Sequence, residues 1–145
     1  DMKSVNITEV VTSLLKEYIQ NSKRASEQLD IRLPHGNIWI LAQEKILIRI
    51  LCNLIDNALK YSTGDIMFYM WGESEYCHIQ ISNDYISDEE LKSIFDLFYT
   101  KDEARIKSSG IGLYATRKLV IQISGDIQVN YEAGIFTVSI KLPLI

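Results

Sequence analysis

Four polar side chains share one face of an otherwise apolar helical run between Ile46 and Tyr61. They fall at positions i, i+3, i+4 and i+7, which lie above one another on a helix surface: Asn53, Asp56, Asn57 and Lys60. The other residues of the run have the periodicity of a buried helix face: Ile50, Leu51, Leu54, Ile55, Ala58 and Leu59.

The types of these side chains indicate a metal-bound phosphate chain as the ligand. Two carboxamides, a carboxylate and an ammonium are costly if they are left dry and unpaired. An asparagine supplies a neutral oxygen ligand for Mg²⁺, and a lysine supplies a point charge for phosphate. The alternative is that this is the solvated face of an amphipathic helix.

Two further motifs follow downstream. The first is Phe95-x-x-Phe98, and the second is Gly110-Ile111-Gly112 immediately before a predicted helix. Glycines allow the backbone to approach phosphates closely, and a helix N-terminus offers free N–H groups and a favourable dipole. An ordinary entry from loop to helix is the alternative interpretation of the glycine pair.

The order and spacing of these motifs resemble the ATP-binding catalytic domain of bacterial sensor histidine kinases. That domain is part of a superfamily shared with gyrase B, Hsp90 and MutL. The segment from Asn53 to Tyr61 resembles the N-box, Phe95 and Phe98 resemble the F-box, and Gly110 with Gly112 resembles the second glycine box. Residues 133–143 resemble the last strand, so the resemblance covers almost the whole chain.

The resemblance assigns expected roles to the N-box residues. Asn57 would coordinate the Mg²⁺ of Mg-ATP, and Asn53 would help to hold the metal-bound phosphates. Lys60 would contact phosphate, and Tyr61 would pack beside the adenine. Asn57 and Lys60 are therefore the expected catalytic residues. The role of Asp56 is open, and it could neutralise Lys60 at i+4.

The resemblance also predicts an ATP lid over residues 99–109. Arg105 is the expected phosphate contact there, whereas the neighbouring lysines are interpreted as solvated. Phe95 and Phe98 would anchor the base of the lid. The nucleotide would further contact the segment that opens the next helix: Gly110, Ile111, Gly112 and Leu113.

The first glycine box departs from the family pattern of Asp-x-Gly-x-Gly. Residues 81–87 contain no glycine. Asn83 continues the strand face of Ile81 and so replaces the aspartate that accepts a hydrogen bond from the adenine amino group. Its amide oxygen can still accept, but adenine selectivity over guanine is open and weaker affinity is expected. Asp84 is the fallback acceptor, and Ile86 would line the base pocket.

The pattern of elements predicts an α+β fold with two layers. The resemblance implies that these layers are a mixed sheet and three helices, the Bergerat-type ATP-binding fold. Helices are expected around Val10–Ile19, Ile46–Tyr61 and Gly112–Ile123, with Thr8 as an N-cap of the first and Gly125 as the C-cap of the last. Strands are expected over 31–33, 37–41, 66–71, 76–82, 126–131 and 135–142. Residues 1–145 are expected to form one domain, as a fragment of a larger sensor kinase.

Composition restricts the function classes. The net charge of −4 argues against nucleic acid as the main partner. Cys52 and Cys77 are interpreted as small core residues. No apolar run is long enough to span a bilayer, and no signal peptide is visible.

The preferred hypothesis is a histidine kinase catalytic domain that binds ATP and Mg²⁺ and delivers the γ-phosphate to a histidine on a separate dimerisation domain. The resemblance implies a homodimeric, membrane-anchored parent with this domain in the cytoplasm and a response regulator downstream. Neither His35 nor His78 has the helical context of the phosphoacceptor. The alternatives are a degenerate regulatory module, and an ATPase or serine kinase of the same superfamily with a carboxylate base near Asp56.

Overall fold

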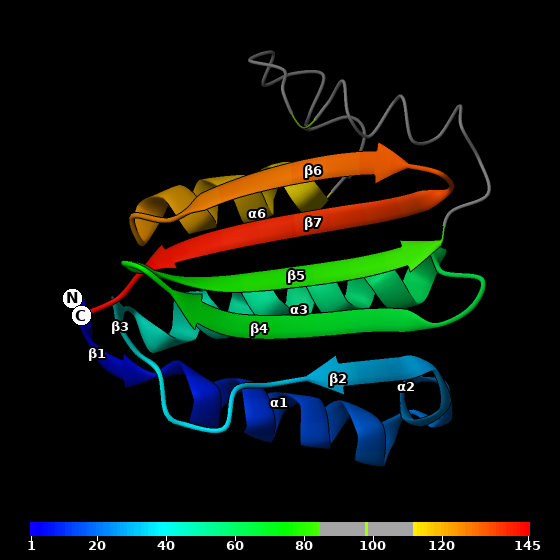
Figure 1. Ribbon diagram of the computed structural model, residues 1–145, viewed down its shortest axis with the longest axis horizontal. Helices are drawn as coiled ribbons and strands as arrows, with labels where there is room; N and C mark the ends of the chain where they lie inside the picture. Colours follow the sequence, from blue (N-terminus) through cyan, green and yellow to red (C-terminus); the bar gives the residue numbers. More distant parts are fainter. Residues whose placement is uncertain (85–97, 99–111) are drawn as a thin grey trace.

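The computed structural model describes residues 1–84, 98 and 112–145 (Figure 1). Along the chain its elements are β1 (Lys3–Asn6), α1 (Ile7–Asn21), α2 (Lys23–Gln28), β2 (Leu29–Arg32), β3 (Trp39–Ala42), α3 (Glu44–Tyr61), β4 (Ile66–Glu73), β5 (Tyr76–Asp84), α6 (Gly112–Gln122), β6 (Asp126–Glu132) and β7 (Ile135–Pro143).

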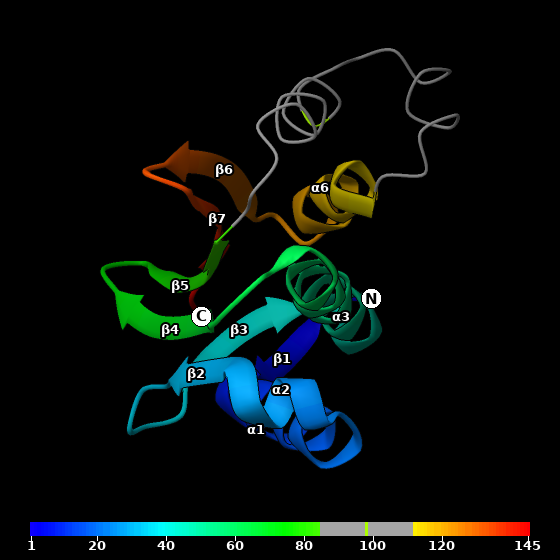
Figure 2. The ribbon, with the colours of Figure 1, turned by 90° about the vertical axis from the view of Figure 1, so that its right-hand side faces the viewer.

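The main sheet has five strands in the order β2-β4-β5-β7-β6. It is mixed, because β2 runs parallel to β4 whereas the other neighbours are antiparallel. The helices α1, α3 and α6 cover one face of this sheet (Figure 2). The predicted two-layer α+β sandwich is therefore confirmed.

Two small elements were not predicted from the sequence. The strand β1 pairs with β3 in a separate two-stranded sheet, and α2 is a helix of six residues. Each has only one buried side chain, Val5 in β1 and Ala25 in α2. A single apolar position gives no periodicity to detect, so such elements form through their tertiary contacts.

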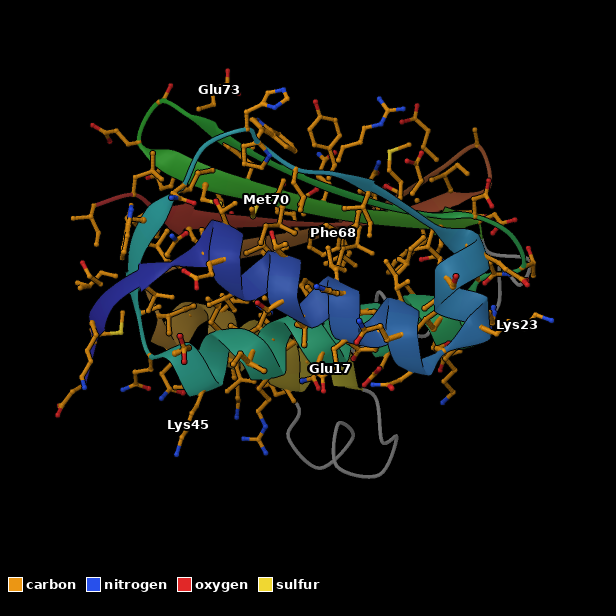
Figure 3. All side chains as sticks on the ribbon, turned by 90° about the horizontal axis from the view of Figure 1, so that it is seen from below. Glu17, Lys23, Lys45, Phe68, Met70 and Glu73 are labelled. Atoms are coloured by element: carbon orange, nitrogen blue, oxygen red, sulfur yellow. The ribbon has the colours of Figure 1, made fainter. Side chains whose placement is uncertain are left out.

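The core lies between the sheet and the helix layer. On β4, Ile66, Phe68 and Met70 are buried and alternate with more exposed residues, as the strand period of two requires. Phe68 and Met70 are labelled between the sheet and α1 in Figure 3. Cys77 is also buried, and burial raises the pKa of its thiol to about 12. Cys52 is only half-buried, so the core prediction holds for Cys77 alone.

The N-cap of α1 is Asn6, and the prediction of Thr8 was wrong. The Asn6 side chain accepts a hydrogen bond from the backbone N–H of Glu9 at 3.2 Å. The Thr8 hydroxyl instead accepts from the N–H of Ile38 at 2.9 Å, which ties the loop before β3 to the first turn of α1. The helix therefore begins one residue after an Asn cap, the arrangement that satisfies its free N–H groups.

The C-terminus of α6 ends in a Schellman motif that differs from the prediction. Ser124, not Gly125, has the left-handed backbone, with φ of 64°. The N–H of Gly125 bonds to the carbonyl of Val120 at 2.9 Å, and the N–H of Ser124 bonds to Ile121 at 2.9 Å. Gly125 is needed for another reason: a Cβ there would lie 2.7 Å from Leu142 Cδ2 and 3.0 Å from the Lys141 carbonyl oxygen.

We expect Gly125→Ala to lower the free energy of unfolding by about 1–3 kcal/mol, because the added methyl forces α6 and β7 apart. Gly36→Ala is the matched control, since a Cβ at Gly36 meets nothing within 4 Å. Urea unfolding followed by circular dichroism measures both. Equal stability of the two variants would contradict the proposed close contact.

Candidate functional site

Three elements carry the described polar residues of the candidate site: the C-terminal half of α3, the end of β5 and the start of α6. In Figure 1, α3 and β5 end toward the right of the view, and α6, which packs against α3, begins near the middle of the view. The end of β5 is tied to the chain just after α3, because Asp84 accepts hydrogen bonds from Thr63 and Gly64.

The packing of α3 against α6 sets the position of the two asparagines. The side-chain amide of Asn53 donates to the hydroxyl of the fully buried Thr116 at 3.3 Å. The two helices run antiparallel in Figure 1. The residue one helical turn after Asn53 in α3 therefore lies beside the residue one helical turn before Thr116 in α6. This step places Asn57 level with Gly112, the first residue of α6.

Asn57 presents a free carboxamide beside the N-terminus of α6. It is half-buried, and its side chain has no hydrogen-bond partner among the described residues. Lys60 is exposed one turn further on, with its ammonium 5.2 Å from the centre of the Tyr61 ring. A neutral oxygen ligand, a cation and a helix N-terminus together suit a metal-bound polyphosphate.

The described residues contain no group of three or more His, Cys, Asp or Glu side chains that could hold a metal ion. A resident metal cage is therefore not formed by this part of the chain. Mg²⁺ keeps several waters and is often held by one or two protein oxygens together with substrate phosphates. The single oxygen of Asn57 fits that mode of binding.

Asp56 does not neutralise Lys60. Its carboxylate accepts a hydrogen bond of 2.7 Å from the hydroxyl of Tyr18 on α1. On a helix of 100° per residue, Asp56 leans toward α1 whereas Asn53 and Asn57 lean toward α6. Burial, followed by the bond to Asp56, raises the pKa of the Tyr18 phenol well above its ordinary value, so Tyr18 stays a proton donor.

Asn83 occupies the position predicted for the base acceptor. It is 4% exposed and continues the buried face of β5. Its amide nitrogen donates to the carbonyl of Asp84 at 2.9 Å. The side-chain oxygen accepts no hydrogen bond from the described residues, so an acceptor without charge remains at the end of β5.

Asp84 has a structural role and is not a spare acceptor for a base. Its carboxylate accepts from the hydroxyl of Thr63 at 2.7 Å and from the N–H groups of Thr63 and Gly64 at 3.2 and 3.1 Å. The Thr63 hydroxyl is the largest cause that lowers the pKa of Asp84 below its ordinary value. The charged carboxylate thus fixes the turn that ends α3.

We expect Asp84→Asn to lower the free energy of unfolding by about 1–2 kcal/mol at neutral pH, because charge-assisted hydrogen bonds are lost. The folded pKa of Asp84 is lowered from 3.8, so its contribution is present above that value and disappears as the pH falls through the folded pKa. The difference in the free energy of unfolding between variant and wild type should therefore disappear in strong acid. Urea unfolding at a series of pH values checks this, with the exposed neighbour Asp65→Asn as control. A difference that persists at the lowest pH would contradict it.

Phe98 is a buried core residue, in agreement with its predicted structural role, whereas the lid that it would anchor lies outside the described residues. Phe98 is fully buried, and its carbonyl accepts a hydrogen bond from the guanidinium of Arg117 at 2.9 Å. The same guanidinium lies 5.5 Å from the centre of the Phe98 ring. No local sequence pattern indicates this role of Arg117, since a cation on an amphipathic helix is ordinarily solvated.

The N-terminus of α6 holds the other predicted residues that the structure describes. Gly112 opens the helix, and Leu113 is 2% exposed within the hydrophobic core. Four predicted nucleotide contacts lie outside the described residues: Ile86, Arg105, Gly110 and Ile111. Phe95 and the predicted lid over residues 99–109 also lie outside them.

The C-terminus of α3 is closed by a cation that the sequence did not reveal. The guanidinium of Arg24 on α2 donates to the carbonyl of Ser62, directly after the last turn of α3. Cations stabilise the negative end of a helix. The short helix α2 therefore helps to fix the part of α3 that carries Asn57 and Lys60.

Comparison with known proteins identifies the class. Residues 42–145 match the family model described as histidine kinase-, DNA gyrase B-, and HSP90-like ATPase. That match spans well over half of the sequence, so the chain belongs to this ATPase family.

Curated relatives include bacterial sensor proteins. Sensor protein RprX of Bacteroides fragilis is 28% identical over 99% of this chain and 30% of its own length. Sensor histidine kinase YcbM of Bacillus subtilis is 27% identical over 94% of this chain and 47% of its own length. The chain thus spans less than half of each of these two relatives.

Solved structures share the fold. The catalytic domain of histidine kinase ThkA superposes with a TM-score of 0.77 at 17% identity, covering 99% of this chain and 95% of that one. The histidine kinase domain of the E. coli osmosensor EnvZ gives a TM-score of 0.74 at 22% identity, covering 99% and 89%. The mixed sheet with its helix layer is therefore the fold of histidine kinase catalytic domains.

Proposed function

We propose that residues 1–145 form the ATP-binding catalytic domain of a two-component sensor histidine kinase. The observation that carries the proposal is the carboxamide of Asn57, which has no partner among the described residues and is held level with the N-terminus of α6 by the Asn53–Thr116 bond of 3.3 Å. Family membership supplies the nucleotide class, and the sensor proteins among the relatives supply the context.

Each residue of the site has a definite task in this proposal. Asn57 gives an oxygen to Mg²⁺, and Asn53 positions the phosphates that the ion binds. Lys60 neutralises phosphate charge, and Tyr61 packs beside the adenine. The Asn83 oxygen accepts from the adenine amino group. When bound, Mg²⁺ supplies the charge neutralisation that phosphoryl transfer needs.

The remaining predicted contacts complete the proposal. Arg105 contacts a phosphate, and Ile86 lines the base pocket. The segment from Gly110 through Ile111 and Gly112 to Leu113 offers backbone N–H groups to the phosphates. The γ-phosphate goes to a histidine on the dimerisation domain of the parent kinase.

The parent protein is proposed to be a homodimer anchored in the membrane, with this domain in the cytoplasm and a response regulator as its next partner. Helices long and apolar enough to cross a bilayer do not occur in the described part of the chain.

The two alternatives differ in what the site residues do. An ATPase needs a base for water, and Asp56 is engaged by the Tyr18 hydroxyl on the α1 side of the helix. That bond favours a kinase over an ATPase. A degenerate regulatory module is motivated by the missing first glycine box, but Asn83 retains an acceptor at the corresponding position.

Titration calorimetry with ADP, in the presence of Mg²⁺ and then of excess EDTA, tests the proposal. We expect saturable binding that weakens when the metal is removed. No heat at millimolar nucleotide, from a sample that circular dichroism reports as folded, would favour the degenerate module. Sustained ATP turnover by the chain alone would favour the ATPase.

A further inference from the structure

A continuous groove follows α1 on the side that faces the N-terminal half of α3. It consists of two adjoining hollows of about 500 Å³ and 480 Å³. The two hollows share Leu14, Glu17 and Ile48, so they form one surface. Figure 3 views the molecule from this side, with Glu17 labelled where α1 and α3 meet.

The floor of this groove is apolar and open to solvent. Val10 and Leu14 are half-buried and pack against the core, so their outer surfaces form the base. Ile48 is 36% exposed and Trp39 is 48% exposed. Exposed apolar surface that is contiguous and rimmed by polar residues is typical of an interaction site.

The rim of the groove is acidic. Three exposed carboxylates border it: Glu9, Glu17 and Glu44. The residues that line the two hollows include no lysine, arginine or histidine. Lys45 lies next to Glu44 but extends away from α1 in Figure 3. The charged side chains around the apolar floor are therefore all negative, which favours a cationic partner.

The length of the groove suits a helix. It runs from Asn6, which caps the start of α1, to Asn21 at the end of α1. A helix of 15 residues is about 22 Å long, which corresponds to about four turns of a helix lying alongside it. Apolar side chains at i, i+3, i+4 and i+7 of such a helix would reach the floor, as in other grooves that bind amphipathic helices.

We propose that this groove docks a basic amphipathic helix of a partner protein. Its apolar face would lie on Val10, Leu14 and Ile48, and its lysines or arginines would pair with Glu17 and Glu44. The surface is on the α1 side of α3, away from Asn57, so the inference stands whether or not the chain binds nucleotide. At the far end of the groove, Tyr18 connects it to Asp56 of α3.

Fluorescence anisotropy at low salt tests this inference with a fluorescein-labelled peptide of about 18 residues, made of Leu and Lys at helical spacing. The same peptide with Glu in place of Lys is the charge control. We expect the Lys peptide to bind and the Glu peptide not to bind. Glu17→Gln with Glu44→Gln should weaken binding by about tenfold or more, and Ile48→Gln by about fivefold.

Matched variants separate the groove from general attraction to an acidic chain. Glu75→Gln with Glu132→Gln removes the same charge from two exposed positions elsewhere, and Ile121→Gln removes an apolar side chain that is 58% exposed on α6. We expect both controls to bind within about twofold of wild type.

Three outcomes would overturn the inference. The first is equal weakening by the control pair, which would indicate non-specific electrostatics. The second is no binding of the Lys peptide to the folded chain. The third is an Ile48-dependent dimer in sedimentation velocity of the chain alone, which would assign the groove to a second copy.

Discussion

Asn57→Ala is expected to weaken binding of Mg-ADP by about 100-fold or more, which corresponds to about 2.7 kcal/mol. The reason is that Asn57 offers a neutral oxygen beside the start of α6 that has no hydrogen-bond partner among the described residues, and alanine has no ligand to replace it. Titration calorimetry in the presence of Mg²⁺ measures the change. In EDTA, the affinities of variant and wild type should converge.

The same variant should leave stability almost unchanged. The Asn57 side chain has no hydrogen-bond partner among the described residues, and alanine is the better helix former. Loss of binding with an unchanged unfolding midpoint would therefore separate ligand binding from folding. Lost binding with unchanged stability is expected only if the Asn57 carboxamide contacts the ligand and does not stabilise the fold.

Asp56→Asn is the matched control for Asn57→Ala. It alters the adjacent residue on α3 but leaves an oxygen that can accept from the Tyr18 hydroxyl. We expect its affinity for Mg-ADP to stay within about threefold of wild type. A loss as large as that of Asn57→Ala would show that the whole polar stripe acts on the ligand, and would contradict the assignment of Asp56 to α1.

Phe68→Ala is expected to lower the free energy of unfolding by about 3–5 kcal/mol. Phe68 is 1% exposed in β4 and lies between the sheet and the helix layer (Figure 3). Removing its ring loses buried apolar surface and leaves a cavity. Domains of this size are stable by about 5–15 kcal/mol, so a substantial part of the stability depends on this side chain.

Tyr69→Ala is the control for Phe68→Ala, because the next residue on β4 points to the other face and is 38% exposed. We expect it to cost about 1 kcal/mol or less, including the loss of its edge-on contact with Trp71. Urea unfolding monitored by circular dichroism compares the two. Equal losses would mean that the outer face of the sheet is also covered.

The elements that the sequence predicted well are those with strong local periodicity. In α3, five of the six residues expected in the core are buried and the sixth, Leu59, is half-buried. The alternation in β5 continues through Ile81 to Asn83. Both patterns are set by neighbours in the chain, so the sequence alone contains them. The position of Asn83 at the site followed from that alternation.

The parts that could not be predicted depend on partners far apart in the chain. Tyr18 and Asp56 are separated by 38 residues, and Thr63 and Asp84 by 21. Asp56 and Asp84 were therefore interpreted through their neighbours, as an ion-pair partner and as a fallback acceptor. In the structure, both carboxylates instead accept hydrogen bonds from hydroxyl groups, Asp56 from Tyr18 and Asp84 from Thr63. No local pattern encodes such pairs, because tertiary packing decides them.

Asn83 and Asp84 also have a consequence for how this family can diverge. Adjacent residues of a strand point to opposite faces, so the amide faces the helix layer while the carboxylate fixes the turn after α3. Point mutations change the two functions separately. A change of one residue in strand length exchanges the two side chains at once. Lineages of such domains can therefore move a carboxylate between the structural turn and the proposed base-binding position by an insertion or deletion, without any new acidic residue.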